Sequence, residues 1–150
     1  MQNGLLVDVE LGSVIRVVMS STLPNLCDVG RGRYVNVITA GPTSSESVVF
    51  FVHGSCGSAS QWGEQIAHFS SQNRVIAFDA FGCGSSPKPK DWMAYSHENM
   101  LTDLRVIFDR YRGRSNVLCA HSYGSALTMC LAAQLAAEGD SSAIGGIALL

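Results

Sequence analysis

Three short apolar segments, each followed directly by a loop rich in glycine and serine, limit the folds that this chain can adopt. The segments are SVVFFV (residues 47–52), RVIAF (74–78) and NVLC (116–119). The loops after them are HGSCGS (53–58), DAFGCGSS (79–86) and AHSYGS (120–125). SVVFFV is apolar on both faces, which is typical of a central strand covered by helices on each side. Such strands alternating with helices predict a parallel α/β sheet, whose chemistry lies at the carboxyl ends of the strands.

The segments between these strands carry apolar residues at helical spacing. Residues 61–70 place Trp62, Ile66 and Phe69 on one helical face, and residues 98–111 repeat such a pattern. The residues after Ser122 are apolar almost all round, so we expect a helix buried on every side. Residues 14–19 and 34–39 predict an antiparallel hairpin, and residues 144–150 begin one more strand. We therefore predict a mostly parallel sheet with an antiparallel N-terminal hairpin and helices on both faces.

The composition is that of a globular protein with one domain. The chain has 150 residues, of which 47% are hydrophobic and 15% charged, and its formal net charge is −2. No basic run indicates a nucleic-acid partner, and no apolar run approaches the ~18 residues of a transmembrane segment. Residues 1–10 lack the basic start of a signal peptide, so we expect an intracellular, cytoplasmic protein. The five cysteines include no C-x-x-C pair, so we expect reduced thiols and no metal site.

The loop AHSYGS has the form small-x-Ser-x-Gly, centred on Ser122. A serine on a sharp turn between a strand and a helix needs small residues two before and two after it, here Ala120 and Gly124, so that the backbones can pass. A buried strand before the motif and a helix of small residues after it are the context of a nucleophile elbow. A plain serine–glycine turn is the alternative interpretation.

The loop HGSCGS suits an oxyanion hole. Gly54 lets the backbone turn its N–H groups towards a neighbouring loop, and the N–H of Ser55 is the best candidate donor, with Tyr123 N–H from the elbow as its partner. An ordinary glycine turn is the alternative. We expect His53 to be a hydrogen-bonded structural residue rather than a catalytic base.

The remaining polar candidates favour structural roles. DAFGCGSSP lacks the third glycine of a dinucleotide-binding loop, and no phosphate-binding G-K-[ST] motif exists, so we expect no cofactor. We interpret Asp79 and Ser85 as turn-stabilising residues, and Asp103 as a structural hydrogen-bond acceptor on the long helix. His68 and His97 are predicted to lie on the surface, away from the strand ends.

Taken together, FFVHGSCGSASQW, VIAFDAFGCGSSPKP and NVLCAHSYGSALTMCLA resemble the α/β-hydrolase superfamily from about residue 8 onward. Within the superfamily, these segments most resemble the α/β-hydrolase domain-containing protein 8 group. They are also similar to epoxide-hydrolase-like members. The resemblance implies that Ser122 is the nucleophile and that Ser55 and Tyr123 form the oxyanion hole. Epoxide hydrolases of the superfamily have a carboxylate where this chain has Ser122, which argues against their chemistry. Ala120 replaces the usual first glycine of the elbow.

The resemblance also implies an acid and a histidine that follow the nucleophile in the chain. All four histidines, at positions 53, 68, 97 and 121, precede Ser122. We therefore expect these residues to be the N-terminal part of a single, incomplete domain that is inactive and poorly soluble on its own. The intact protein is then a serine hydrolase acting on a small ester, thioester or lipid-like acyl substrate. The alternative is a non-catalytic binding or scaffold protein of the same fold.

Overall fold

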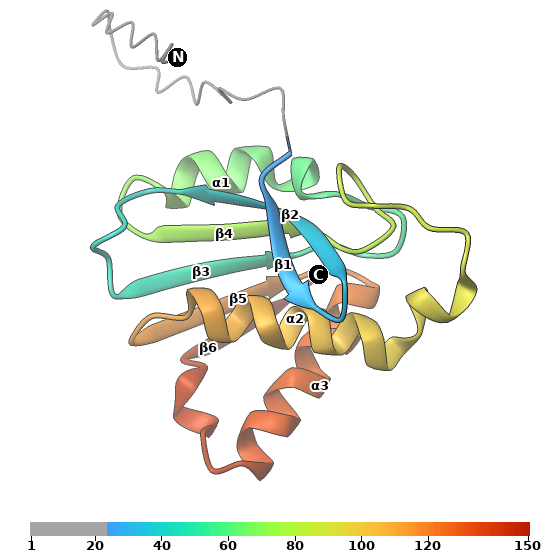
Figure 1. Ribbon diagram of the computed structural model, residues 1–150. Coiled ribbons are helices and arrows are strands. Elements are labelled where there is room, and N and C mark those ends of the chain that lie inside the picture. The colour runs from blue at the N-terminus through green and yellow to red at the C-terminus, as the bar shows by residue number, and fades with distance from the viewer. Residues whose placement is uncertain (1–23) are drawn as a thin grey trace, which may run out of the picture.

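The computed structural model describes residues 24–150, which form one six-stranded sheet (Figure 1). The strands lie in the order β1-β2-β4-β3-β5-β6 across the sheet. Their bounds are Leu26–Gly30 (β1), Arg33–Ala40 (β2), Ser47–Val52 (β3), Arg74–Asp79 (β4), Ser115–Ala120 (β5) and Gly146–Leu149 (β6). β3 pairs in parallel with β4 and β5, and β5 pairs in parallel with β6. The three apolar segments of the sequence are thus the central strands, and the predicted α/β architecture is confirmed.

The antiparallel part of the sheet differs from the prediction in its first strand. β2 pairs antiparallel with β4 on one side and with β1 on the other. β1 lies between residues 14–19 and 34–39, in the stretch expected to be the loop of the predicted hairpin, so that expectation is wrong. Asn25 explains why the strand forms there, because its side chain donates to Val37 O (3.1 Å) and its backbone N–H donates to Asn36 Oδ1 (2.9 Å). The predicted strand at residues 14–19 lies outside the described residues.

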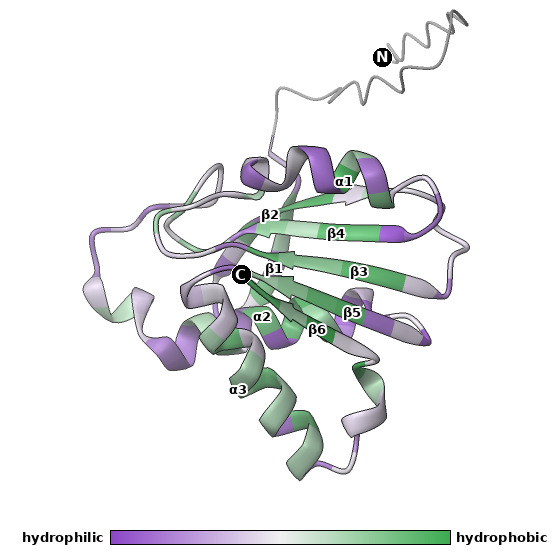
Figure 2. Ribbon diagram, turned by 180° about the vertical axis from the view of Figure 1, so that it is seen from behind, coloured by the Kyte–Doolittle hydropathy of each residue, from purple (hydrophilic) through white to green (hydrophobic). Residues whose placement is uncertain are grey.

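Helices cover the two faces of the sheet. The α-helices are Gly63–Phe69 (α1), His97–Tyr111 (α2) and Tyr123–Ala137 (α3), and the 3-10 turns are Ala59–Trp62 (η1), Trp92–Tyr95 (η2) and Ser141–Ala143 (η3). Alternation along β3 divides its side chains between two apolar layers. Phe50 packs against Phe108 of α2 with ring centroids 5.3 Å apart, whereas Phe51 stacks on Trp62 at 5.0 Å. The sheet is therefore a core element buried on both sides, as Figure 2 shows by its green central strands.

The helix after Ser122 is buried along one face only, which corrects the prediction of a helix enclosed all round. Leu127, Leu131 and Leu135 recur at a spacing of four and pack into the core. Met129 lies on the other face and is 50% exposed in the described part of the chain. The outer face is made mostly of small residues. Because these residues are apolar, the sequence pattern showed no polar face.

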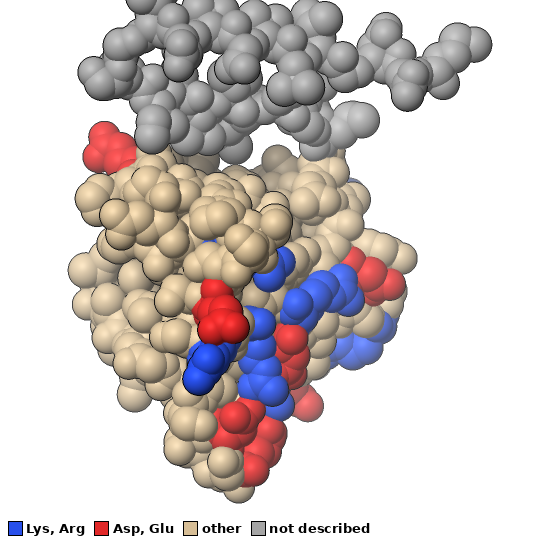
Figure 3. Space-filling view, turned by 90° about the vertical axis from the view of Figure 1, so that its left-hand side faces the viewer, with Lys and Arg blue, Asp and Glu red and all other residues tan. Residues whose placement is uncertain are grey.

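Charged side chains gather at the end of the molecule where the parallel strands begin. Figure 3 shows basic and acidic side chains next to one another on this side. Arg105 bonds Glu138 at 2.8 Å, Arg112 bonds Asp140, and Arg114 lies 3.5 Å from Glu46. The opposite edge, where the parallel strands end, holds the glycine- and serine-rich loops.

Candidate active site

Ser122 sits on a strained turn between β5 and α3. Its backbone has φ 54° and ψ −121°, in the left-handed region that a non-glycine residue adopts only under constraint. Hydrogen bonds fix both sides of the turn: His121 N–H donates to Val52 O (3.0 Å) and Gly124 N–H to His121 O (2.9 Å). Ser122 N–H donates to Leu150 O at 3.1 Å, which joins the turn to the end of β6. The Ser122 residue is exposed, and its hydroxyl makes no hydrogen bond within residues 24–150.

Close backbone approaches explain the small residues around this turn. A Cβ atom on Gly124 would lie 2.6 Å from the carbonyl oxygens of both Val52 and His53. A Cβ atom on Gly54 would lie 2.9 Å from Cβ of Ser122. Ala120, in place of the usual first glycine, is fully buried and its methyl group belongs to the core. The loops after β3 and β5 therefore touch through their backbones at the candidate nucleophile.

His53 is buried, and both of its ring nitrogens are hydrogen-bonded. It is 4% exposed, its Nδ1 donates to Gly54 O at 2.7 Å, and its Nε2 accepts from Ala80 N–H at 2.9 Å. Burial lowers the pKa of the imidazole, a shift that the Gly54 carbonyl and the charge of Asp79 only partly oppose. A neutral imidazole with both nitrogens engaged ties the loops after β3 and β4 together.

The backbone N–H groups of Ser55 and Tyr123 are the candidate donors to an oxyanion. Gly57 N–H donates to Gly54 O (3.1 Å), which folds the loop after β3 into a turn with Cys56 at φ 57°. Neither Ser55 N–H nor Tyr123 N–H donates to another group among the described residues. Tyr123 N–H is in the first turn of α3, where N–H groups carry a partial positive charge. The loop glycines are thus compatible with a pair of donors near Ser122.

A cavity of about 800 Å³ opens beside these loops. Its wall is mostly apolar and comes from Phe78, Phe81, Trp92, Tyr95, Met100 and Leu127. Ser55 and Tyr123 also line the cavity, so both candidate oxyanion donors belong to residues of its wall. A space of this size and polarity suits an apolar small molecule.

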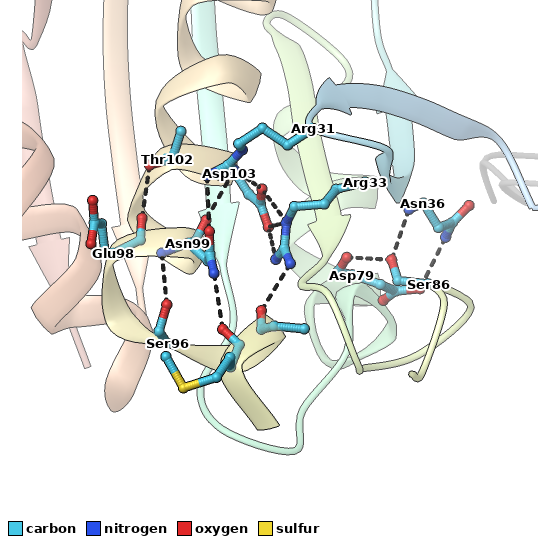
Figure 4. A network of polar contacts seen from close by, with 12 residues as sticks. Arg31, Arg33, Asn36, Asp79, Ser86, Ser96, Glu98, Asn99, Thr102 and Asp103 are labelled. Atoms are coloured by element: carbon cyan, nitrogen blue, oxygen red, sulfur yellow. Dashed lines mark hydrogen bonds and ion pairs between the residues drawn. The ribbon is translucent and has the colours of Figure 1, made fainter. Parts of the chain in front are cut away.

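Asp79, at the end of β4, organises the neighbouring loop. Its carboxylate accepts from Ala59 N–H (2.7 Å), Ser85 N–H (2.8 Å) and Asn36 Nδ2 (3.0 Å). Ser86 donates its hydroxyl to Asp79 O (2.6 Å) and accepts from Asn36 N–H (2.8 Å), as Figure 4 shows. All of these hydrogen bonds stabilise the loop after β4. The turn-stabilising interpretation of Asp79 therefore agrees with its contacts.

Asp103 of α2 is likewise engaged in structure. Arg33 Nε contacts Asp103 Oδ1 at 2.9 Å and Arg31 contacts the same oxygen at 2.8 Å, so the two guanidinium groups surround the carboxylate (Figure 4). Arg33 also donates to Ala94 O (2.8 Å) and lies 3.8 Å from the ring centroid of Phe81. The contact of Arg33 with the cavity wall was not predicted, because its partners are 48 to 70 positions away in the chain.

His97 lies closer to the candidate nucleophile than predicted. His97 begins α2 and is exposed, but its Nδ1 lies 3.0 Å from the hydroxyl of Tyr123, the residue after Ser122. The prediction that His97 lies away from the strand ends is therefore wrong. His68 is exposed and packs edge-on against Phe69. Within the described residues no histidine bonds to the Ser122 hydroxyl.

The described residues contain no cluster of three histidine, cysteine, aspartate or glutamate side chains that could hold a metal ion. All five cysteines are free thiols. No helix within residues 24–150 has the length and hydropathy needed to span a bilayer.

Comparison with curated proteins finds relatives that match part of this chain. Human Protein ABHD8 is 39% identical over 89 residues, which cover 59% of this chain and 20% of that protein. Probable lysophospholipase BODYGUARD 1 of Arabidopsis thaliana is 33% identical over 104 residues, which cover 66% of this chain and 22% of the plant protein. The chain thus spans only about a fifth of the length of these relatives.

Solved structures share the fold. The chain superimposes on the epoxide hydrolase VrEH1 from Vigna radiata with a TM-score of 0.71 at 23% identity, over 84% of this chain and 38% of the enzyme. A thioesterase domain from the curacin biosynthetic pathway gives a TM-score of 0.71 at 21% identity, over 85% and 45%. The sequence model for the alpha/beta hydrolase fold matches residues 47–150, from the start of β3 onward. The resemblance predicted from the sequence is confirmed: this chain belongs to the alpha/beta hydrolase fold family.

Proposed function

We propose that the complete protein is a serine hydrolase of this family and that Ser122 is its nucleophile. The proposal rests on the exposure, the backbone conformation and the unbonded hydroxyl of Ser122. This residue is exposed, its φ is 54°, and its hydroxyl makes no hydrogen bond in the described part of the chain. Strained backbone is retained where the surrounding structure enforces it, and such positions gather at active sites. The family likeness supports a hydrolase in general, and Ser122 supplies the specific chemistry.

In the proposed reaction, Ser122 Oγ attacks an acyl carbonyl and forms a bond to its carbon. The negative charge then develops on the carbonyl oxygen, where the N–H groups of Ser55 and Tyr123 donate to it. Expulsion of the alcohol or thiol leaves an acyl-enzyme, and water releases the acid.

The reaction also needs a base for the Ser122 proton and an acid to orient that base. His53 does not fit the role of base because both of its nitrogens are engaged in the fold. His97 contacts Tyr123 instead of the nucleophile. We propose that the base and its acid come from residues beyond position 150. The share of the structural neighbours that this chain covers, 38% and 45% for the two described above, supports that arrangement.

The cavity points to an acyl substrate with an apolar chain. Phe78, Phe81 and Leu127 offer no hydrogen bonds to a polar ligand, whereas they favour burial of hydrocarbon. The names of two similar proteins, a probable lysophospholipase and a thioesterase domain, support the same class of ester, thioester or lipid-like substrate. The cavity gives no such support to a charged or sugar-like substrate.

A fluorophosphonate probe tests the nucleophile in the complete protein. We expect the probe to label the unsubstituted protein and to leave Ser122→Ala unlabelled. Ser55→Ala is the matched control, because it removes an exposed hydroxyl but keeps the backbone N–H that the proposal uses. Undiminished labelling of Ser122→Ala would refute the assignment.

A second candidate function is a non-catalytic binding or scaffold module. It is favoured by the absence of any histidine bonded to Ser122 within residues 24–150. Under this alternative the cavity binds an apolar ligand without turnover. Binding of a fatty acid with no probe labelling and no hydrolysis by the complete protein would favour it over the enzyme.

A further inference from the structure

The mouth of the cavity carries an unusually exposed pair of large apolar side chains. We call residues 88–95 the mouth segment; they run from Lys88 through the 3-10 turn η2. Trp92 is 86% exposed and Met93 is 72% exposed. In Figure 1 this stretch projects from the edge of the molecule where β3 and β4 end. Burying Trp92 and Met93 against another surface would remove a large apolar area from water.

The mouth segment also carries the only two lysines of the chain, Lys88 and Lys90. Lys88 donates to the carbonyl oxygens of Gly84 and Ser86, the latter at 3.3 Å, and neither lysine has a carboxylate within 4 Å among residues 24–150. Asp91 is the nearest acidic residue in the sequence, and its carboxylate accepts from Met93 N–H at 3.0 Å.

Several arginines, unlike these lysines, have carboxylate partners. Arg31, Arg33, Arg105, Arg112 and Arg114 all form ion pairs with carboxylates. At the end where the parallel strands begin, Arg112 and Arg114 are thus paired with acidic neighbours. The mouth segment is the place where positive charge and exposed apolar area coincide.

Hydrogen bonds hold the mouth segment in this exposed conformation. Tyr95 donates its hydroxyl to Pro89 O, and Asn99 Nδ2 donates to Met93 O at 2.9 Å. Arg33 donates to Ala94 O at 2.8 Å from the buried ion pair with Asp103. The backbone is thus fixed at several points while the Trp92 and Met93 side chains extend outward. A preorganised surface loses little conformational entropy when it binds.

We propose that the mouth segment docks on an anionic phospholipid bilayer, with Trp92 and Met93 in the interfacial region and Lys88 and Lys90 at the lipid phosphates. Tryptophan favours the membrane interface because its ring is apolar and its N–H is polar, and lysine is attracted by the negative surface potential. Lys90, Trp92 and Tyr95 line the cavity, so docking places the cavity opening against the bilayer. The docking requires neither the Ser122 hydroxyl nor turnover, so it stands apart from the proposed function.

Vesicle flotation tests the charge and the apolar contributions separately in the complete protein. We expect binding to phosphatidylcholine vesicles that contain phosphatidylserine, and weaker binding to phosphatidylcholine alone. The double variant Lys88→Gln, Lys90→Gln should lose affinity by about 25-fold at low salt, which is about fivefold for each lysine. Trp92→Ser with Met93→Ser should abolish binding. Arg114→Gln and Met129→Ser are matched controls at exposed positions elsewhere, and they should bind as the unsubstituted protein does.

Hydroxyl-radical footprinting locates the contact. Vesicles should protect Met93 and Trp92 from oxidation and leave Met129, which is 50% exposed on α3, unprotected. The same result is expected for Ser122→Ala, which separates docking from catalysis. Oxidation of Met93 to the same extent with and without vesicles would overturn the proposal, whether the side chain is then exposed in both states or covered by another part of the protein in both. Unchanged binding by the Trp92 and Met93 double variant would overturn it as well.

Discussion

Two serine- and glycine-rich loops leave the same edge of the sheet, after β4 and after β5, and their serines are in opposite states. Ser86, in the loop after β4, is 3% exposed, donates to Asp79 O and accepts from Asn36 N–H. Ser122, in the loop after β5, is exposed, has φ 54° and makes no side-chain hydrogen bond in the described part of the chain. The sequence context alone makes the two serines look similar. Their hydrogen bonds separate a serine that holds a loop from one that is available to react.

The difference also extends to the backbone. The loop after β4 meets its need for left-handed conformations with glycines, at Gly82 (φ 88°) and Gly84 (φ 47°). The loop after β5 places a serine in that region, where a non-glycine residue costs about 1–3 kcal/mol. Contacts with Val52 and Leu150 hold the strained turn in place. We infer that the first loop is built for stability and the second for presenting a side chain.

The largest expected effect separates the two serines by activity. Ser122→Ala in the complete protein should reduce kcat for hydrolysis of p-nitrophenyl acetate by about 10⁴-fold or more, because it removes the proposed nucleophile. Its free energy of unfolding should change little, since the hydroxyl makes no hydrogen bond in the described structure. Ser86→Ala should show the reverse, with a loss of stability of about 1–3 kcal/mol and activity retained in the folded fraction. If both variants lost activity equally, Ser122 would not differ from Ser86 in its importance for catalysis.

The second effect concerns the residue that holds the loop after β4. Asp79→Ala should lower the free energy of unfolding by about 3–5 kcal/mol, because Ala59 N–H, Ser85 N–H and Asn36 Nδ2 lose the buried carboxylate that accepts from them. Chemical denaturation measures this change. Asp140→Ala is the control, since Asp140 pairs with Arg112 at the surface and its loss should cost less than about 1 kcal/mol. A small effect at Asp79 would mean that the loop is held by other contacts.

A third effect tests the close packing behind Ser122. Gly124→Ala should destabilise the protein by about 1–3 kcal/mol, because the new Cβ meets two backbone carbonyl oxygens at 2.6 Å. Gly63→Ala, at the start of α1, is the control: its Cβ would have open space and its φ is −52°. That control should be neutral or stabilising by up to about 1 kcal/mol. Thermal unfolding of the two variants gives the comparison.

The smallest effect is the pH dependence contributed by His53, which links the loops after β3 and β4. Burial holds its folded-state pKa below the ordinary value near 6.5. The unfolded chain therefore binds more protons just below pH 6.5, and stability falls as the pH falls through that window. The slope from one such group is at most about 1.4 kcal/mol per pH unit. Denaturation should be measured between pH 7.5 and pH 5, which is about one to two units on either side of the ordinary pKa. The free energy of unfolding of His53→Gln should depend less steeply on pH than that of the unsubstituted protein. An unchanged slope would show that His53 is not the group responsible.

Much of the sheet could be predicted because its central strands are continuous apolar runs. β3 has the predicted bounds, and β4 and β5 extend the predicted runs by one or two residues. β1 was missed because only Cys27 and Val29 of its residues are buried, and Asp28 and Gly30 beside them are typical of turns. Its position depends on pairing with β2, which a local pattern does not reveal.

The candidate site shows the same limit. The spacing of Ala120, Ser122 and Gly124 indicates an elbow because the motif and its flanking elements are local in sequence. The contact of His97 with Tyr123 and the support of Ala94 by Arg33 join segments 26 and 61 positions apart. Such contacts follow from the order of the strands in the sheet, which the sequence pattern did not specify. The local half of the site was therefore predictable, and the part assembled from distant segments was not.

The site of covalent modification by a fluorophosphonate decides whether Ser122 is the nucleophile. After the complete protein is labelled and digested, mass spectrometry identifies the serine that carries the phosphonyl group. We expect one adduct, on the peptide that contains Ser122, with Ser55, Ser85 and Ser86 unmodified. An adduct on one of those other serines, or hydrolysis of an ester by protein that carries no adduct after full exposure to the probe, would show that Ser122 is not the nucleophile.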